Sequence, residues 1–117
     1  MSAALAIALT LFVPQQTDAT HEQAVHCTGV FLYAYAIMAQ IAENEPTADN
    51  AETAAATVRL LKVADDDRLA AARREGISIE ASGQRFQIWL SENSEATAAR
   101  DLESCLGRYE GRLTDGA

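Results

Sequence analysis

Basic residues are few and occur late in this chain. Nine Lys and Arg stand against 17 Asp and Glu, giving a net charge of −8, and no Lys or Arg precedes Arg59. Such a chain repels nucleic acid and anionic lipid headgroups. No run of five or more basic residues follows Arg59, so we expect no surface that tracks a phosphate backbone. A DNA or RNA partner is therefore disfavoured.

Proline and glycine are also scarce, at two and six residues among 117. Hydrophobic residues make up 49 % of the chain, and many of them are alanine. Alanine favours helices because it loses no side-chain entropy on entering one. No repeat or low-complexity linker divides the sequence, so composition predicts one all-α domain.

The N-terminal residues have the layout of a secretory signal peptide. An apolar run from Ala3 to Val13 is followed by Pro14, and Ala19 stands at the end of a small-x-Ala cleavage pattern. The apolar run is too short to span a bilayer as a helix. One feature departs from the signal-peptide pattern, because no Lys or Arg precedes the run. We predict a cleaved signal over residues 1–19 and a periplasmic or secreted domain over residues 20–117, without stable membrane insertion. A buried N-terminal helix is the alternative.

Apolar spacing and capping residues predict four amphipathic helices with short connections. A strand over residues 86–90 competes with the third helix, and Asn93-Ser94 either separates or only kinks the last two. The predicted helices run from near Asp18 or Thr20 to about Asn44, from Thr47, Asp49 or Asn50 to Gly76, from Ser78 through 93, and from near Ser94 to about Glu110. This order suggests an up-down-up-down bundle.

The only two cysteines, Cys27 and Cys105, fall on the apolar stripes of the first and last predicted helices. In an antiparallel bundle the start of the first helix lies beside the end of the last, so both cysteines fall at the same end. In an oxidising compartment a single structural disulfide is the simplest use of such a pair. Closing a loop of nearly eighty residues stabilises by roughly 4 to 5 kcal/mol in the chain-entropy treatment.

Two histidines beside Cys27 imitate several chemical sites without completing one. His21 and His26 are five residues apart and diverge by about 140° around a helix, whereas a zincin needs four-residue spacing. His26 points about 100° away from Cys27 on a helix, so no Cys-His catalytic pair is expected. Glu22 and His26 remain weak metal candidates. The favoured interpretation is that these are solvated side chains of the first helical turn.

Other cofactor and ion sites are disfavoured as well. Covalent haem needs Cys-x-x-Cys-His, which is absent, and non-covalent haem would use His26 or Met38, a residue better suited to the core. The run Asp65-Asp66-Asp67 lacks the glycine and spaced ligands of a calcium loop. No cofactor is predicted, and neither is enzymatic activity.

The acidic run is predicted to lie on a solvated helix face with Arg68 nearby. Asp65 is the exception, because it lies in line with the apolar stripe of its helix. If it is buried, Arg85 or Arg100 would offset its charge.

Three aromatic residues are candidates for contact with a partner: Tyr33, Tyr35 and Trp89. Tyr33 and Tyr35 project from different sides of one helix, so at least one should face outward. An exposed aromatic ring with a polar tip suits protein recognition. Ordinary packing is the alternative.

A signal, a small acidic helical domain and one disulfide form a layout similar to that of periplasmic acid-stress chaperones. The layout is also similar to that of small immunity proteins that neutralise effectors of bacterial secretion systems. The likeness rests on no diagnostic motif and implies no site residue. The leading hypothesis is thus an exported, non-enzymatic protein that binds another protein, immunity-like or chaperone-like. The alternative is a small-ligand or metal carrier that uses the N-terminal His/Glu cluster.

Overall fold

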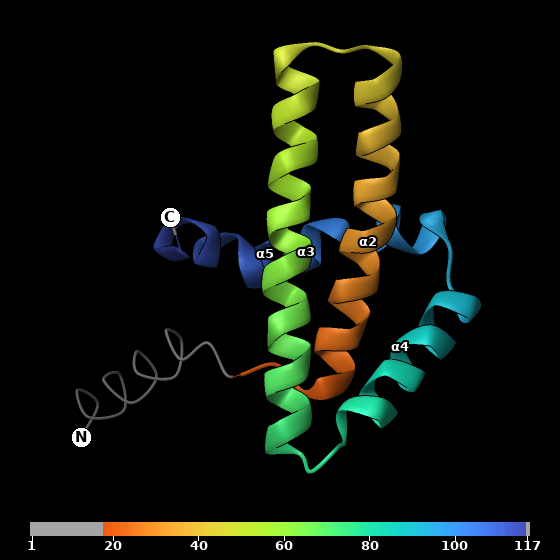
Figure 1. Ribbon diagram of the computed structural model, residues 1–117, viewed down its shortest axis with the longest axis vertical. Helices are drawn as coiled ribbons and strands as arrows, with labels where there is room; N and C mark the ends of the chain where they lie inside the picture. The colour runs from red at the N-terminus through yellow and green to blue at the C-terminus, as the bar shows by residue number, and fades with distance from the viewer. Residues whose placement is uncertain (1–17, 117) are drawn as a thin grey trace, which may run out of the picture.

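Four α-helices make up most of residues 18–116, the part of the chain described by the structure, a computed structural model (Figure 1). No strand occurs in this part, so residues 86–90 are helical and the predicted all-α class is confirmed. Residues 1–17, where most of the predicted signal falls, lie outside the described part. The helices are α2 (His21–Asn44), α3 (Ala48–Arg74), α4 (Ile79–Glu92) and α5 (Glu95–Gly116).

Hydroxyl side chains fix the starts of the first three described helices. Thr20 forms a capping box with Gln23: its Oγ1 accepts from the Gln23 backbone N–H at 3.1 Å, and its own N–H donates to Gln23 Oε1 at 3.0 Å. Thr47 and Ser78 cap α3 and α4 in the same way, through their hydroxyls. Each cap satisfies a backbone N–H that the helix itself leaves unpaired. After α3 the chain turns at Gly76, whose φ of 71° favours glycine.

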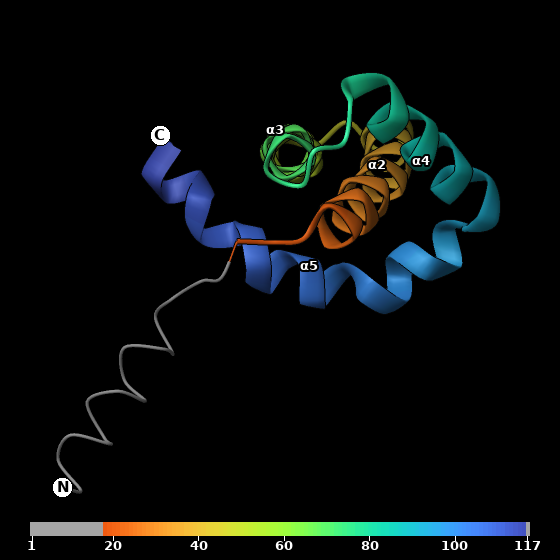
Figure 2. The ribbon, with the colours of Figure 1, turned by 90° about the horizontal axis from the view of Figure 1, so that it is seen from below.

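The helices α2 and α3 form a long antiparallel hairpin, and the other two helices pack on its lower part (Figure 1). The helix α4 rises beside α2, whereas α5 lies on another side and runs across both hairpin helices (Figure 2). Much of the contact is made by alanine, whose small side chain lets helices approach closely. The buried alanines of the hairpin are Ala24, Ala34, Ala64, Ala71 and Ala72. The upper half of the hairpin stands clear of α4 and α5.

A disulfide joins Cys27 of α2 to Cys105 of α5, as the sequence predicted. The two Cα atoms lie 5.4 Å apart, within the usual range for a disulfide. Both cysteines are buried in the main apolar cluster, whose other buried members are Val30, Phe31, Leu60, Ala64, Ala98 and Tyr109. The bond therefore closes the core where α5 crosses α2.

An acidic side chain is buried at the same crossing. Asp67 of α3 accepts a hydrogen bond from the Tyr109 hydroxyl at 2.6 Å and pairs with Arg112 at 3.4 Å, both from α5. Burial, followed by the hydrogen bond to this carboxylate, raises the pKa of Tyr109 well above its ordinary value. The phenol therefore stays neutral and remains a donor to Asp67.

The prediction that Asp65 is the acid at risk of burial is wrong. Asp65 is half-exposed and pairs with Arg68, one turn further along α3, at 2.9 Å. Asp66 is exposed, as predicted, but Asp67 and Arg68 are buried, so the predicted solvated face is only partly correct. The error arises because α5 lies across the face of α3 that carries Asp67, two residues further on, and hydrophobic periodicity does not reveal that crossing.

We expect the double substitution Cys27→Ala/Cys105→Ala to lower the free energy of unfolding by about 4 kcal/mol or more, because the bond closes 78 residues of sequence. The measurement is urea denaturation followed by circular dichroism at 222 nm. A loss below about 1 kcal/mol would show that packing alone holds α5 in place.

Candidate functional site

Both histidines of α2 are hydrogen-bonded to α4. His21 is only 2 % exposed, and its Nε2 lies 2.7 Å from the hydroxyl of Ser82, the fully buried residue of α4. The same hydroxyl accepts from Arg68 of α3 at 2.6 Å. His21 is thus the centre of a buried junction of three helices. The prediction that it is a solvated first-turn residue is wrong.

The surroundings of His21 disfavour its charged form. Burial is the main cause that lowers the pKa of His21, and the nearby guanidinium of Arg85 lowers it further, while Glu75 acts in the opposite direction. The Glu75 carboxylate also accepts from the His21 backbone N–H at 2.6 Å. Glu75 ends α3, so this bond ties the start of α2 to the end of its neighbour.

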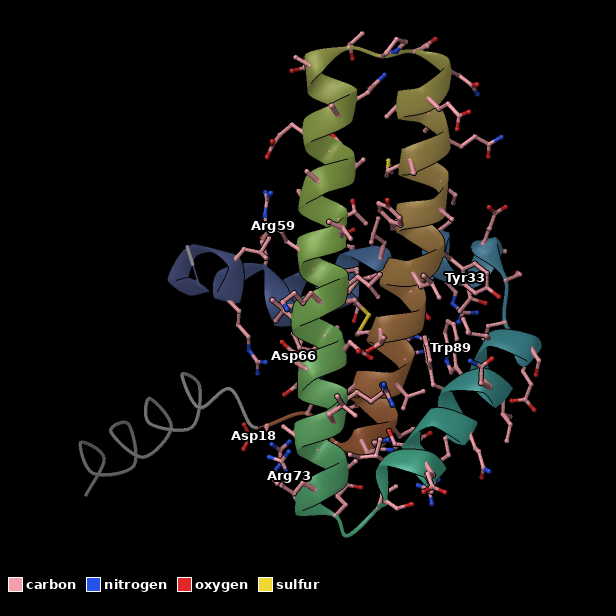
Figure 3. All side chains as sticks on the ribbon, in the orientation of Figure 1. Asp18, Tyr33, Arg59, Asp66, Arg73 and Trp89 are labelled. Carbon is pink, nitrogen blue, oxygen red and sulfur yellow. A yellow bond between two sulfur atoms is a disulfide. The ribbon has the colours of Figure 1, made fainter. Side chains whose placement is uncertain are left out.

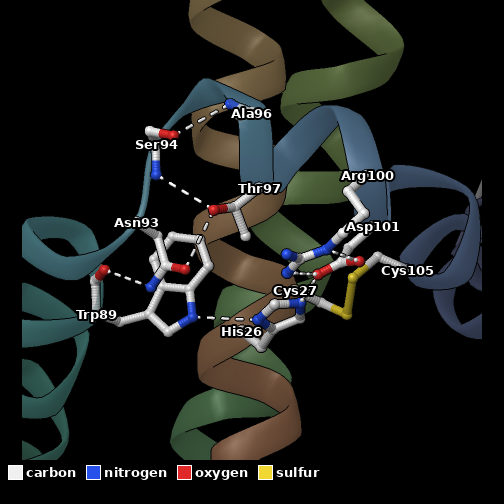
Figure 4. A network of polar contacts seen from close by, with 10 residues as sticks. All are labelled: His26, Cys27, Trp89, Asn93, Ser94, Ala96, Thr97, Arg100, Asp101 and Cys105. Atoms are coloured by element: carbon white, nitrogen blue, oxygen red, sulfur yellow. Dashed lines mark hydrogen bonds and ion pairs between the residues drawn. A yellow bond between two sulfur atoms is a disulfide. The ribbon is translucent and has the colours of Figure 1, made fainter.

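His26 links α4 to α5 in a second network, drawn in Figure 4. The indole N–H of Trp89 donates to His26 Nδ1 at 3.1 Å, and His26 Nε2 lies 2.8 Å from Asp101 Oδ2. An indole nitrogen can only donate. Nδ1 must therefore be the unprotonated nitrogen, and Nε2 carries the hydrogen that faces the carboxylate. This arrangement corrects the prediction of a solvated His26.

Asp101 is held in its ionised form. Its neighbour Arg100 donates to it twice, at 2.9 and 2.8 Å. These hydrogen bonds, with a smaller contribution from His26, hold the pKa of Asp101 at about 2. The carboxylate is thus a fixed negative charge beside the imidazole at every pH above about 4.

Trp89 fills the space between α4 and α2. Its ring lies against Gly29, where an added Cβ would overlap it, and it faces the ring of Tyr33 at 6.0 Å. The Tyr33 hydroxyl donates to the backbone oxygens of Leu90 and Asn93, at 2.8 and 3.2 Å. Figure 3 shows the Tyr33 and Trp89 side chains between the two helices.

Two of the three aromatic residues proposed as partner contacts have internal partners. Tyr33 and Trp89 are half-buried and join α4 to α2 through their polar atoms. Tyr35, two residues after Tyr33 on α2, is also half-buried. Contact of these three residues with a partner stays a prediction.

The helix α4 buries little of its own surface. Ser82 is its one fully buried residue, and its apolar side chains Ile79 and Ile88 are 72 % and 55 % exposed. Hydrogen bonds with His21, His26, Tyr33 and Arg68 therefore supply part of its attachment, and the packing of Trp89 against α2 supplies another part. Such a helix is a candidate for local opening.

The two weak metal candidates, Glu22 and His26, do not form a metal site in the structure. Glu22 is exposed, while both ring nitrogens of His26 already face Trp89 and Asp101. Across residues 18–116 no group of three His, Cys, Asp or Glu side chains is placed to hold an ion. Cys27 lacks a free thiol, because it is bonded to Cys105.

An apolar groove of about 290 Å³ runs between α2 and α3 and ends at α4. We call it the distal groove. Val58 on its wall is 42 % exposed. The groove is lined by Thr28, Leu32, Val58, Leu61, Lys62, Asp65 and Phe86.

The hairpin beyond the groove is acidic. Four carboxylates stand exposed there, and between residues 27 and 58 no Lys or Arg balances them. Arg59 pairs with one of them, Glu52, at 3.2 Å. The four are Glu43, Glu45, Asp49 and Glu52.

A second, more polar cleft of about 530 Å³ lies beside the disulfide, between α2 and α5. Glu22 and Arg108 line it with opposite charges, together with His26 and Trp89.

No protein-family model, curated protein or solved structure matches this chain. Its function is therefore argued from its own geometry.

Sequence reasoning missed three residues that organise the site: His21 as a core residue, Ser82 and Asp101. A signal existed for two of them. His21 stands seven residues before Thr28 and Ser82 seven before Trp89, two turns along the buried face of each helix. For Asp101 no local signal distinguishes it from a solvated acid, because its partner lies 75 residues away.

We expect Gly29→Ala to lower the free energy of unfolding by about 1 to 3 kcal/mol, because the new methyl group displaces the Trp89 ring. Urea denaturation gives the change, and tryptophan fluorescence shows whether the ring has moved. The matched control is Gly107→Ala in α5, where a Cβ meets nothing within 4 Å and helix propensity should give up to about 1 kcal/mol of stabilisation. Equal effects of the two substitutions would show that Trp89 is not wedged against α2.

Proposed function

We propose that this protein is an exported, non-enzymatic protein-binding module and that the distal groove is its docking surface. The observation that carries the proposal is a mainly apolar groove between α2 and α3 that has an exposed valine, Val58, on its wall. Val58 of the groove is 42 % exposed, and Leu32 and Leu61 beside it are half-buried. Apolar side chains that line a groove together mark interaction sites more often than scattered ones do.

The partner we propose is a basic amphipathic helix of another protein. A groove between two helices accepts a third helix, whose apolar side lies against the floor. The exposed carboxylates of the hairpin, with no basic residue between positions 27 and 58 to balance them, favour a positively charged partner. The same charges oppose a second copy of this chain, because two acidic hairpins repel one another.

Two observations support export. A buried disulfide persists in an oxidising compartment, and the sequence begins with the apolar run and small-residue pattern of a secretory signal. Within this proposal the protein is periplasmic or secreted and acts as an immunity-like or chaperone-like module.

The structural roles of Cys27 and His26, the residues considered for catalysis, favour a binding role over an enzymatic one. Cys27 is committed to the disulfide, and His26 is held between Trp89 and Asp101 as a structural link. No observation favours the metal-carrier alternative over protein binding.

We expect an 18-residue amphipathic helical peptide of Leu and Lys to bind the purified protein in isothermal titration calorimetry. Val58→Gln should weaken binding about fivefold, because it removes roughly 1 kcal/mol of apolar burial. The control Ile79→Gln changes a residue that is more exposed but lies on α4 outside the groove, and it should leave the affinity unchanged. Raising the salt concentration should also weaken binding.

Three outcomes would contradict the proposal. A peptide of Leu and Glu that binds equally well would remove the charge argument. Equal effects of Val58→Gln and Ile79→Gln would place the site elsewhere. Dimerisation that Val58→Gln abolishes, or binding to zwitterionic lipid vesicles without binding to the peptide, would assign the groove to another occupant.

A further inference from the structure

We propose that protonation of His21 and His26 releases α4 from α2 and lengthens the distal groove, so that mild acid strengthens binding of the partner helix. This inference rests on the proposed function, because it concerns the regulation of that same groove. It starts from one juxtaposition: the chain has only two histidines, and both are bonded to α4.

The contacts that His21 and His26 make with α4 lie on one face of that helix. His21 meets Ser82 and His26 meets Trp89, seven residues further along α4. Seven residues are two helical turns, so both contacts lie on the same side of α4. Histidine is the side chain whose ordinary pKa lies between pH 5 and 8. Both attachments of α4 to α2 therefore pass through a titratable side chain.

Protonation of His26 would place two N–H donors, the Trp89 indole and the His26 Nδ1, opposite one another. Its Nδ1 accepts the Trp89 indole N–H, and a proton on Nδ1 turns that acceptor into a donor. The contact with Asp101 responds in the opposite way, because an imidazolium still donates from Nε2 and gains a charge partner. Acid therefore breaks the link to α4 and strengthens the link to α5.

Charged groups face His26 from two helices. From α5, Asp101 lies 2.8 Å from its Nε2, and Arg100 pairs with the same carboxylate. Arg108 of α5 and Glu22 of α2 line the neighbouring cleft with opposite charges. From α4, the side facing His26 is the uncharged indole of Trp89.

His21 resists protonation while α4 is in place. Arg68 of α3 and Arg85 of α4 both disfavour the imidazolium, and Glu75 at the end of α3 favours it. Glu22 and Glu92 line the adjoining groove. Burial is the main cause that lowers the pKa of His21 in the closed form.

The sign of the pH response follows from this lowered pKa. With α4 released, His21 is exposed and regains an ordinary pKa of about 6.5. The released form then binds more protons than the closed form, so acidification below about pH 6.5 shifts the equilibrium toward release. Above that pH both forms carry a neutral His21, and the closed form is unaffected.

Release of α4 would extend the groove rather than unfold the protein. Phe86 is the residue of α4 that lines the distal groove. Outside the groove, α4 also lies against Val25 and Gly29 of α2. The helix α5 stays in place, because the disulfide holds it to α2. The apolar floor open to a partner helix therefore becomes longer.

The test compares the wild type with His21→Gln/His26→Gln at pH 8 and pH 5.5. Glutamine at position 26 still accepts from Trp89 and donates to Asp101, but it does not titrate. Hydrogen exchange gives the protection of the α4 amides, corrected for intrinsic rates. Emission from Trp89, the sole tryptophan, reports on the same helix. If the double variant fails to fold, judged by circular dichroism at pH 8, His26→Gln alone serves in its place.

We expect protection of α4 in the wild type to fall at least tenfold at pH 5.5, with less than a twofold change in α5. The Trp89 emission should shift to the red, and the Leu/Lys peptide should bind at least threefold more tightly. In the double variant none of these quantities should change with pH, and in His26→Gln the changes should be smaller than in the wild type.

Failure of this inference is distinguishable from failure of the proposed function. Peptide binding at pH 8 with no loss of α4 protection at pH 5.5 overturns the release, even if Trp89 is quenched. Loss of α4 protection without a change in peptide affinity overturns the regulation. An equal pH response in the double variant overturns the role of the histidines. Absence of peptide binding at both pH values overturns the proposed function instead, whatever α4 does.

Discussion

One covalent bond, between Cys27 and Cys105, is the constraint on which the arrangement of the helices depends. It fixes α5 across the hairpin of α2 and α3. Half of the buried apolar residues are alanines, which bury little surface each. The bond compensates for that small core and protects the Asp67–Tyr109 contact made at the same crossing.

The helices α4 and α5 are attached to the hairpin in different ways. The helix α5 is cross-linked to α2, whereas α4 is held by the packing of Trp89 and by hydrogen bonds with His21, His26, Tyr33 and Arg68. The upper hairpin has neither helix against it. The distal groove lies between the hairpin helices, with the exposed carboxylates further along the hairpin. Phe86 of α4 is part of its lining, so in our proposal the groove changes when α4 is released.

Local features were predictable from the sequence and crossings between helices were not. The caps Thr47 and Ser78 and the disulfide follow from residue type and from the order of the helices. The burial of Asp67 instead of Asp65 depends on where α5 crosses, which no local pattern encodes. The seven-residue spacing of His21 from Thr28 indicates a buried position for His21, but no local pattern shows that Ser82 and Trp89 pack against the two histidines. The distal groove was missed for the same reason, since its lining comes from three helices.

The most direct test of the docking surface is an NMR titration of the ¹⁵N-labelled protein with the Leu/Lys peptide at pH 8. We expect the largest chemical-shift changes at Thr28, Leu32, Val58 and Leu61, with α5 almost unaffected. Changes centred on the cleft beside the disulfide, or spread evenly over all four helices, would contradict the assignment of the distal groove as the binding site.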